Sequence, residues 1–220
     1  MASAGYMRLN EQIAYLRTHL LPAVFDPTGN YSDQSIFVKA LAFRVLAHAE
    51  IEEFFEERVT EIAKTAWASW KEKCHVSATA MCLIAFSGRE MKLPPDTYSA
   101  PGDNQKKIWP SLIDVNHRLN EAVSLFIKQI SINNHGIREK NILGMLLPVG
   151  IDHKKIDDVF LTEIDDFGQQ RGKAAHTSSA KFVQQGIDPK GEYDRLLKIV
   201  SLLLPLDEEL DIVLKNCTSV

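Results

Sequence analysis

Apolar residues recur along this chain at intervals of three and four, which places them on one face of an α-helix, and strand-like alternation is almost absent. This pattern predicts an all-α fold, a helical bundle built from long helices. The second helix is long for a globular protein, so a break within it is left open. Pro205 is expected to kink or split the last helix. The expected helices cover about 9–20, 33–73, 77–86, 110–132, 138–147, 153–176 and 189–215.

Capping residues and one loop organise these helices. Ser32 or Asp33 can cap the second helix, and Asp152 is expected to cap the helix that follows it. One long loop rich in proline and glycine, about 87–109, interrupts the pattern. It is too long for a plain connector and is interpreted as a flap or a binding loop. The chain shows no internal repeat, so we expect one domain over residues 1–220, with this loop as an insertion.

Composition limits the classes of function. Of 220 residues, 25 are Lys or Arg and 29 are Asp or Glu, which gives a formal net charge of -4. A protein of this charge is not a general electrostatic binder of nucleic acid, so RNA contact requires a local basic patch or a groove formed by a dimer. The first residues, MASAGYMRLN, contain no apolar signal core, and no apolar run is long enough to span a bilayer. We therefore expect a cytoplasmic protein.

The three cysteines, Cys74, Cys82 and Cys217, stand at scattered positions. Their odd number is unlike a disulfide framework and is typical of a reducing compartment. Cys74 and His75 with Cys82 lack the paired C-x-x-C spacing of a zinc site. We interpret the cysteines as small buried side chains, with zinc ligation as the less favoured alternative, and we expect no metal or cofactor.

An arginine falls on the apolar stripe of the helix expected over 153–176. On an ideal wheel of about 100° per residue, Arg171 continues a stripe made by Ile156, Val159, Phe160, Ile164 and Phe167. An arginine on a core face is costly unless it is paired or lines a cavity. It predicts either a structural ion pair or a cation aimed into a cleft to hold an anion. His176 follows about 140° further round the helix, and Gly172 allows the turn between them to distort.

The long helix expected over 33–73 carries a second polar group. Arg44, His48 and Glu52 lie four residues apart in or beside its apolar stripe, where successive side chains can touch. Three polar residues on one apolar face predict a buried network. Two interpretations stay open: a structural Arg–Glu brace, or one wall of a site that orients Arg171. In the second, we expect Glu52 to form a charge-assisted hydrogen bond with Arg171 or His48.

Taken together, these motifs resemble the HEPN superfamily of nucleases and nucleotide-binding domains. RGKAAH fits the family's R-x4–6-H motif, and RVLAHAEIEEF, INNHGIREKNILGMLLPVGI and DDFGQQRGKAAHTSS are similar to its RiboL-PSP-HEPN branch. The resemblance spans roughly residues 30–200. It implies a metal-independent endoribonuclease, often a toxin or an antiviral defence effector, in which Arg171 and His176 form the catalytic pair. It also implies a homodimer in which two motifs build one site. Gly172 departs from the family, since many members have a polar residue, often Asn, directly after the motif arginine.

The chemistry of RNA cleavage suits these residue types. RNA carries its own nucleophile, the 2′-hydroxyl beside the scissile phosphate. His176 titrates near neutrality and can exchange a proton, while Arg171 supplies permanently charged donors to the phosphorane. The expected products are a 2′,3′-cyclic phosphate and a 5′-hydroxyl. Weaker candidates for lining the RNA groove are Lys173, Lys181, Lys154 and Lys155.

Three alternatives are left open by the sequence. The chain can be a non-catalytic HEPN-like module that binds a nucleotide or a partner protein, or a purely structural helical subunit. A metal-dependent nuclease is the third, although the acids concerned are more typical of a solvated helix face: Asp157, Asp158, Asp165 and Asp166. We expect RNA and a second copy of the chain as partners, and an antitoxin or an ATPase is a candidate partner.

Overall fold

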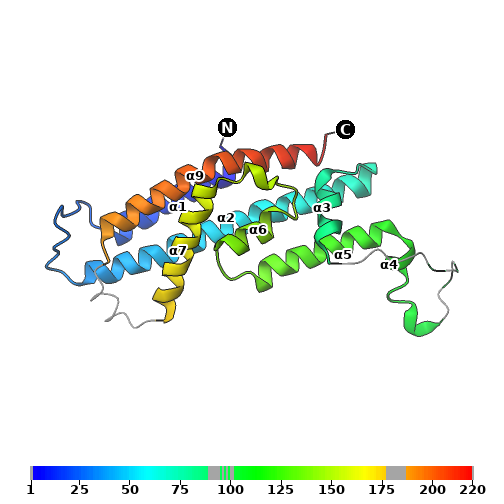
Figure 1. Cartoon of the computed structure of the whole chain (residues 1–220), viewed down its shortest axis with the longest axis horizontal. Helices are drawn as coiled ribbons and strands as arrows, with labels where there is room; N and C mark the ends of the chain where they lie inside the picture. Colours follow the sequence, from blue (N-terminus) through cyan, green and yellow to red (C-terminus); the bar gives the residue numbers. More distant parts are fainter. Residues whose placement is uncertain are drawn as a thin grey trace. The chain divides into compact units, whose positions relative to one another are not determined.

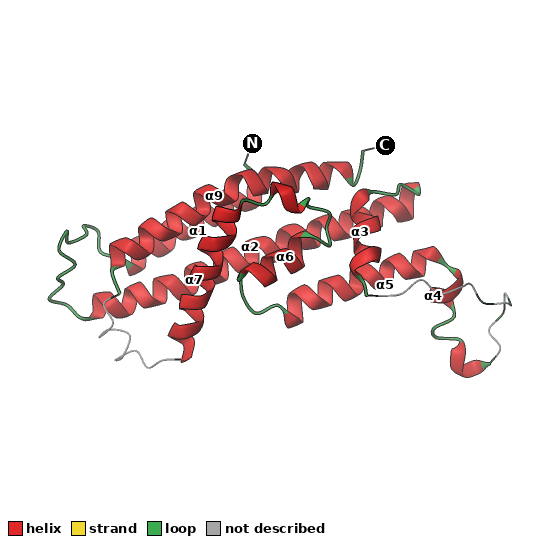
Figure 2. Cartoon of the chain, in the orientation of Figure 1, coloured by secondary structure: helices red, strands yellow, loops and turns green. Residues whose placement is uncertain are grey.

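The computed structural model describes residues 2–88, 95, 97, 99, 102–176 and 187–219, apart from the side chains of Gln105, Ser111 and residues 174–176. These described residues form helices, turns and loops with no strand among them (Figure 1, Figure 2). The all-α class is therefore confirmed. Most of the loop expected over 87–109 lies outside the described residues, so its role stays a prediction.

The helices account for nearly every expected element. α2 is one uninterrupted helix of 39 residues, so the described chain has no break there. Pro205 lies inside α9, which continues through it. In chain order the elements are α1 (Ala4–Leu20), α2 (Ser35–Lys73), α3 (Ala78–Phe86), the 3-10 helix η1 (Asp103–Gln105), α4 (Pro110–Ile113), α5 (Val115–Lys128), the π-helix η2 (Gln129–Asn133), α6 (Glu139–Leu146), the 3-10 helix η3 (His153–Lys155), α7 (Asp158–His176) and α9 (Pro189–Asn216).

Two helix boundaries differ from expectation because an aspartate caps a new start. Asp114 ends α4 and begins α5, and its Oδ1 accepts a hydrogen bond from the Asn116 N–H at 2.9 Å, so the helix expected over 110–132 is divided. Asp152 was expected to cap the helix that contains Arg171, but η3 intervenes. Asp157 is the cap instead, since its Oδ1 accepts from the Val159 N–H at 2.7 Å at the start of α7.

The chain divides into two compact units, and the expectation of a single domain stays a prediction. The first unit comprises Met1–Glu57, His135–Leu143 and His153–Glu209, and the second comprises Arg58–Asn134, Gly144–Asp152 and Leu210–Val220. All the described residues of the sequence-predicted site belong to the first unit.

The core of the first unit comes from inward faces of α2, α7 and α9. Its best-buried side chains, each at most 1% exposed, include Phe43, Ile51, Phe55, Phe160, Ile164, Phe167, Leu196, Ile199 and Leu203. Val159, expected on the same stripe, is 51% exposed, because α7 turns Phe160, Ile164 and Phe167 inward and leaves Val159 beside that row. This core fixes the face of α7 on which Arg171 continues the stripe.

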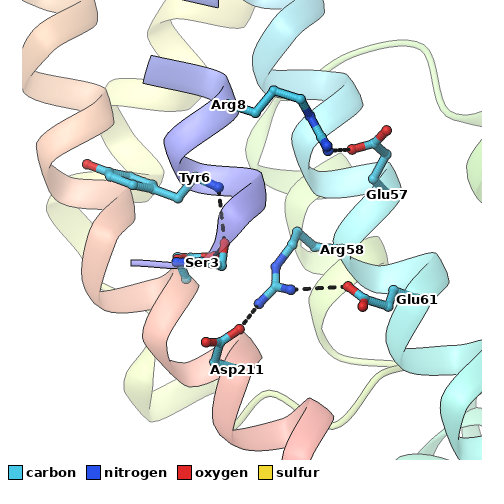
Figure 3. A network of polar contacts seen from close by, with 8 residues as sticks. Ser3, Tyr6, Arg8, Glu57, Arg58, Glu61 and Asp211 are labelled. Atoms are coloured by element: carbon cyan, nitrogen blue, oxygen red, sulfur yellow. Dashed lines mark hydrogen bonds and ion pairs between the residues drawn. The ribbon is translucent and has the colours of Figure 1, made fainter. Parts of the chain in front are cut away.

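Buried polar contacts tie α1 to α9 within the same unit. The Ser3 hydroxyl caps α1 by accepting from the Tyr6 N–H at 3.0 Å, and it donates to the Asp207 carboxylate at 2.7 Å. Arg8 of α1 forms an ion pair with Glu57 of α2 (Figure 3). These contacts hold α1 against its neighbours away from the candidate site residues.

In the second unit, the buried Arg58 makes ion pairs with two acidic side chains. Its guanidinium donates to Asp211 and, at 3.2 Å, to Glu61, as Figure 3 shows. Arg58 therefore has a structural role in that unit.

The cysteines behave differently from one another. Cys217 is fully buried and lies 3.4 Å from the Thr79 hydroxyl, and burial raises the pKa of its thiol. Cys74 was expected to be buried, but it is exposed, because it closes α2 in the left-handed conformation (φ 53°) and its N–H donates to the Trp70 carbonyl at 2.9 Å. Among the residues that the structure describes, no group of three or more His, Cys, Asp or Glu could hold a metal ion.

Candidate functional site

Arg171 lies in the last part of α7, four residues after the buried Phe167. It is half-buried, and its Nε atom is buried with no hydrogen-bond partner among the described residues. Its positive charge lowers the pKa of both His48 and Glu52, two residues of α2. The fold therefore brings the arginine of α7 within electrostatic reach of two of the three polar residues of α2.

His48 is a neutral member of this group. Its side chain is 2% exposed, and its ring stacks against that of Phe167 with centroids 6.2 Å apart. Burial, and then the charge of Arg171, lower its pKa from 6.5 to about 4. His48 therefore remains uncharged near neutral pH. Its Nδ1 lies 3.7 Å from Oε2 of Glu52, which is longer than a hydrogen bond.

Glu52 is the point at which several elements of the unit meet. Burial is the main cause that raises the pKa of this carboxyl group, and the neighbouring Glu56 raises it further. Three groups act in the opposite sense, in decreasing order: a hydrogen bond from the Gly136 backbone, the charge of Arg171 and the charge of His135. Glu52 is thus a half-buried carboxylate that favours cationic or proton-donating neighbours.

Arg44 is part of a different arrangement. Its Nε and Nη2 donate to the two carboxylate oxygens of Glu192 on α9, each at 2.6 Å, and both side chains are 7% exposed. This is a bidentate, buried ion pair. The predicted network therefore divides: Arg44 forms a brace with Glu192, whereas His48 and Glu52 face Arg171.

His135, in the connection before α6, is a residue near Glu52 that was not among the sequence-predicted site residues. His135 is exposed, while the next residue, Gly136, is buried. The segment that contains His135 was noted for its similarity to the RiboL-PSP-HEPN branch, but the segment lacks helical periodicity there, and a lone histidine in a loop has no pattern to distinguish it. The structure shows that this connection supplies two of the groups that act on Glu52.

The position of His176 is known only as the last residue of α7, because its side chain lies outside the described residues. An ideal helix would place its Cα about 7.5 Å along the axis from that of Arg171. The pairing of Arg171 with His176 stays a prediction. Gly172 is half-buried, and a Cβ added there would meet no described atom within 4 Å, so α7 offers an open face at this point.

The three predicted RNA-binding lysines that the structure describes lie in two separate places. Lys173 is exposed on α7 close to Arg171, whereas Lys181 lies outside the described residues. Lys154 and Lys155 form part of η3, before α7 begins, which separates them from Arg171 by about 20 Å of helix. Lys155 also forms an ion pair with Glu209 at 2.6 Å. Of the three predicted lysines that the structure describes, only Lys173 lies close to Arg171 along α7.

The aspartates considered as metal ligands have other contacts. Asp157 caps α7, and Asp158 and Asp166 are exposed. Asp165 accepts hydrogen bonds from Arg138 at 3.0 and 3.3 Å, and the Arg138 guanidinium is the main cause that lowers its pKa. These contacts stabilise α7 and its neighbouring loop.

Comparison with known families gives one match. The family model described as RiboL-PSP-HEPN matches residues 8–216, a range that begins within α1 and runs to the end of α9. No curated protein and no solved structure shows significant similarity to the chain. Among the described helices, none combines the length and apolar character needed to cross a membrane. On the family match, which spans nearly the whole sequence, the chain belongs to the RiboL-PSP-HEPN family.

Proposed function

We propose that this protein is a metal-independent endoribonuclease of the HEPN type. The observation that best supports the proposal is the state of Arg171: its Nε is buried without a hydrogen-bond partner among the described residues, and its charge acts on a neutral histidine and a half-buried carboxylate. A cation in this setting can accept an anionic ligand, and the scissile phosphate of RNA is such a ligand.

In the proposed reaction, the 2′-hydroxyl of RNA attacks the adjacent phosphorus and the 5′-oxygen leaves. Arg171 binds the non-bridging phosphate oxygens and stabilises the charge that develops on the phosphorane. His176 accepts the proton of the 2′-hydroxyl, because an imidazole titrates near neutral pH. His48 is unsuited to that task, since it is buried and its pKa is lowered to about 4.

The proposal includes a homodimer with a composite site. Gly172 leaves the face of α7 open beside Arg171, so a second copy of the helix can approach closely there. Two copies of Arg171 and Lys173 in one groove would concentrate positive charge in a protein whose net charge is -4. We propose a cytoplasmic toxin or antiviral effector as its biological role, with an antitoxin or an ATPase as a candidate regulator.

The decisive experiment measures cleavage of a structured RNA and of an unstructured oligoribonucleotide in excess chelator. We expect cleavage to persist and to give 2′,3′-cyclic phosphate and 5′-hydroxyl ends. Arg171→Ala should lower kcat/KM by roughly 10²–10³-fold, and His176→Ala by a similar factor. Arg8→Ala is the matched control, because Arg8 is an exposed arginine of the same unit paired with Glu57.

Other results would support the alternatives. Phosphate or RNA binding that depends on Arg171 without any cleavage would indicate a non-catalytic binding module. Cleavage that chelator abolishes and Mg²⁺ restores would contradict the metal-independent mechanism. Arg171→Ala and His176→Ala proteins that are folded and cleave at the wild-type rate would refute the assignment of both residues.

The dimer is tested by Ala175→Leu, which places a bulky side chain on the proposed helix contact. We expect the dimer to weaken and cleavage to fall together, since the composite site requires both copies. Sedimentation and activity should be measured at the same protein concentrations. A wild-type monomer that is fully active would contradict the composite site.

A further inference from the structure

His135 is a titratable side chain of the first unit that the proposed mechanism does not use. It lies in the connection Asn134–Arg138 that precedes α6, and its side chain is exposed. An exposed imidazole can donate a proton to a bound ligand or accept one from it. The contacts of its connection determine how close His135 lies to Glu52.

The backbone directly after His135 is packed onto α2. The Gly136 backbone donates a hydrogen bond to Glu52, and Gly136 has a φ of 148°, which favours glycine. A Cβ added to Gly136 would lie 3.7 Å from Nε2 of His48 and 3.8 Å from its Cε1, so the backbone passes against that ring. His135 is therefore attached to a segment whose position is set by both residues of α2.

The same connection is fastened to α7 two residues further on. Arg138 donates to both oxygens of Asp165, and the Glu139 N–H donates to that carboxylate at 3.1 Å. A Cβ added to Gly168 of α7 would come within 3.0 Å of Arg138 Cγ and 3.4 Å of its backbone nitrogen, so the loop and the helix approach closely. Contacts to α2 and α7 thus define the path of the segment that carries His135.

The path of this connection places His135 within electrostatic reach of Glu52. The charges of Arg171 and His135 both act on the Glu52 carboxyl group, from α7 and from the connection respectively. Glu56, also on α2, acts on the same carboxyl group in the opposite sense. An anion bound by Arg171 would lie near the carboxyl group on which His135 also acts.

Cleavage of RNA by its 2′-hydroxyl involves two proton transfers. The O2′–P bond forms as the 2′-hydroxyl loses a proton, and the P–O5′ bond breaks as the 5′-oxygen gains one. One histidine is suited to the first transfer when neutral, whereas the second needs a protonated donor. The proposed mechanism assigns His176 to the first transfer, and it names no donor for the second.

We propose that His135 is this donor: its connection, held against α2 and α7, places it near Glu52, and it protonates the leaving 5′-oxygen while His176 takes the 2′-hydroxyl proton. The inference rests on the proposed ribonuclease function. The proton leaves the His135 imidazolium as the P–O5′ bond breaks. Proton exchange with solvent then restores protonated His135 and neutral His176. Glu52 is then a positioning residue that supplies negative charge beside the protonated donor.

The test compares an RNA oligonucleotide with the same oligonucleotide carrying sulfur in place of the 5′-oxygen at the linkage that the wild-type protein cleaves. A thiolate leaves without protonation, so an enzyme that lacks its general acid still cleaves the sulfur-containing linkage. We expect His135→Ala to cleave ordinary RNA roughly 10²–10⁴-fold more slowly. The same variant should cleave the sulfur-substituted RNA at nearly the wild-type rate. On ordinary RNA, the fall in rate at high pH that the wild-type protein shows should be absent from His135→Ala.

Two controls separate this role from others. Arg171→Ala should be slow on both substrates, because phosphate charge is stabilised in both reactions. His19→Ala should match wild type on both, since His19 is an exposed histidine of the same unit whose ring nitrogen contacts the Tyr15 carbonyl at 2.8 Å. Circular dichroism should show that the His135→Ala protein is folded.

Each remaining outcome overturns the inference. If His135→Ala cleaves ordinary RNA at the wild-type rate, or loses equal activity on both substrates, His135 is not the proton donor. The ribonuclease proposal would still stand in either case, because the wild-type protein cleaves RNA. A wild-type protein that cleaves neither substrate would refute the ribonuclease proposal itself and the role of His135 with it.

Discussion

Two arginines of the first unit, Arg44 and Arg171, occupy inward positions on their helices but have different surroundings. Arg44 is 6% exposed, and both oxygens of Glu192 accept its hydrogen bonds at 2.6 Å. Arg171 is half-buried, its Nε has no hydrogen-bond partner among the described residues, and it faces a neutral His48. The charge of Arg44 is matched by Glu192, whereas Arg171 keeps a buried donor without a hydrogen-bond partner among the described residues.

This difference separates two uses of a buried charge. A paired arginine stabilises the fold only while its partner is present, and removal of one partner leaves an uncompensated charge. An arginine with an unsatisfied donor adds less to stability, and its environment is available for binding. The two sites therefore should respond oppositely when stability and activity are measured on the same variants.

The largest expected effect is on stability at Arg44. Arg44→Ala should lower the free energy of unfolding by about 3–5 kcal/mol, because Glu192 then remains buried without its partner. Arg171→Ala should change it by less than about 1 kcal/mol. Chemical denaturation of both variants gives the comparison. The double variant Arg44→Met with Glu192→Leu should recover most of the lost free energy of unfolding. Equal losses of stability in Arg44→Ala and Arg171→Ala would contradict the distinction between the two arginines.

A pH effect of similar size is expected from His48. Its pKa is lowered to about 4 in the folded protein from 6.5. The unfolded chain therefore binds the proton first as pH falls, so the stability associated with neutral His48 is present above pH 6.5 and is lost as pH falls toward 4. The loss is roughly 3 kcal/mol. Unfolding measured across this range should depend less on pH in His48→Leu, and an unchanged dependence would contradict the neutral, buried assignment.

The coupling of Arg171 to its neighbours gives a smaller, sharper effect. Because the charge of Arg171 lowers the pKa of both His48 and Glu52, Arg171→Met should raise both. NMR titration of the labelled side chains would measure both upward shifts. The Arg44→Met, Glu192→Leu protein is the control and should show neither shift. No change at either residue in Arg171→Met would mean that the arginine lies outside their electrostatic reach.

The smallest stability effect is expected at Glu52. Burial raises the pKa of this carboxyl group, so its charged form is disfavoured in the folded protein at neutral pH. Glu52→Gln should therefore leave stability unchanged or increase it by less than about 1 kcal/mol, while cleavage falls about tenfold through loss of the negative charge. Denaturation and cleavage are measured on one preparation. A variant that is less stable and fully active would reverse the proposed role of Glu52.

Helical periodicity was enough to predict the fold class, because spacing of three and four is a local property of the chain. It also identified Arg44, His48 and Arg171 as polar residues on apolar faces. Periodicity could not identify the partner of Arg44, since Glu192 is 148 residues away and pairs through packing of two helices. The division of the predicted network into a brace and a site therefore emerged only in three dimensions.

Residues outside periodic segments were harder to interpret. His135 lies in a connection, where no face exists from which burial or exposure can be predicted. Its significance depends on Gly136 reaching Glu52 and on Arg138 reaching Asp165, contacts that join three separate segments. Cys74 was misjudged for a related reason, because a left-handed helix terminus is rarely a cysteine.

The continuity of α2 has a consequence for how this family can vary in length. Arg44 and Glu52 stand on the same uninterrupted helix and meet different partners, Glu192 and Arg171. Deleting one residue between them would rotate Glu52 by about 100° and move it about 1.5 Å relative to Arg44, so both partnerships could not be kept. Insertions and deletions that preserve the site should therefore be absent between positions 44 and 52 and should occur in connections such as residues 21–34, where no helical register links the two ends.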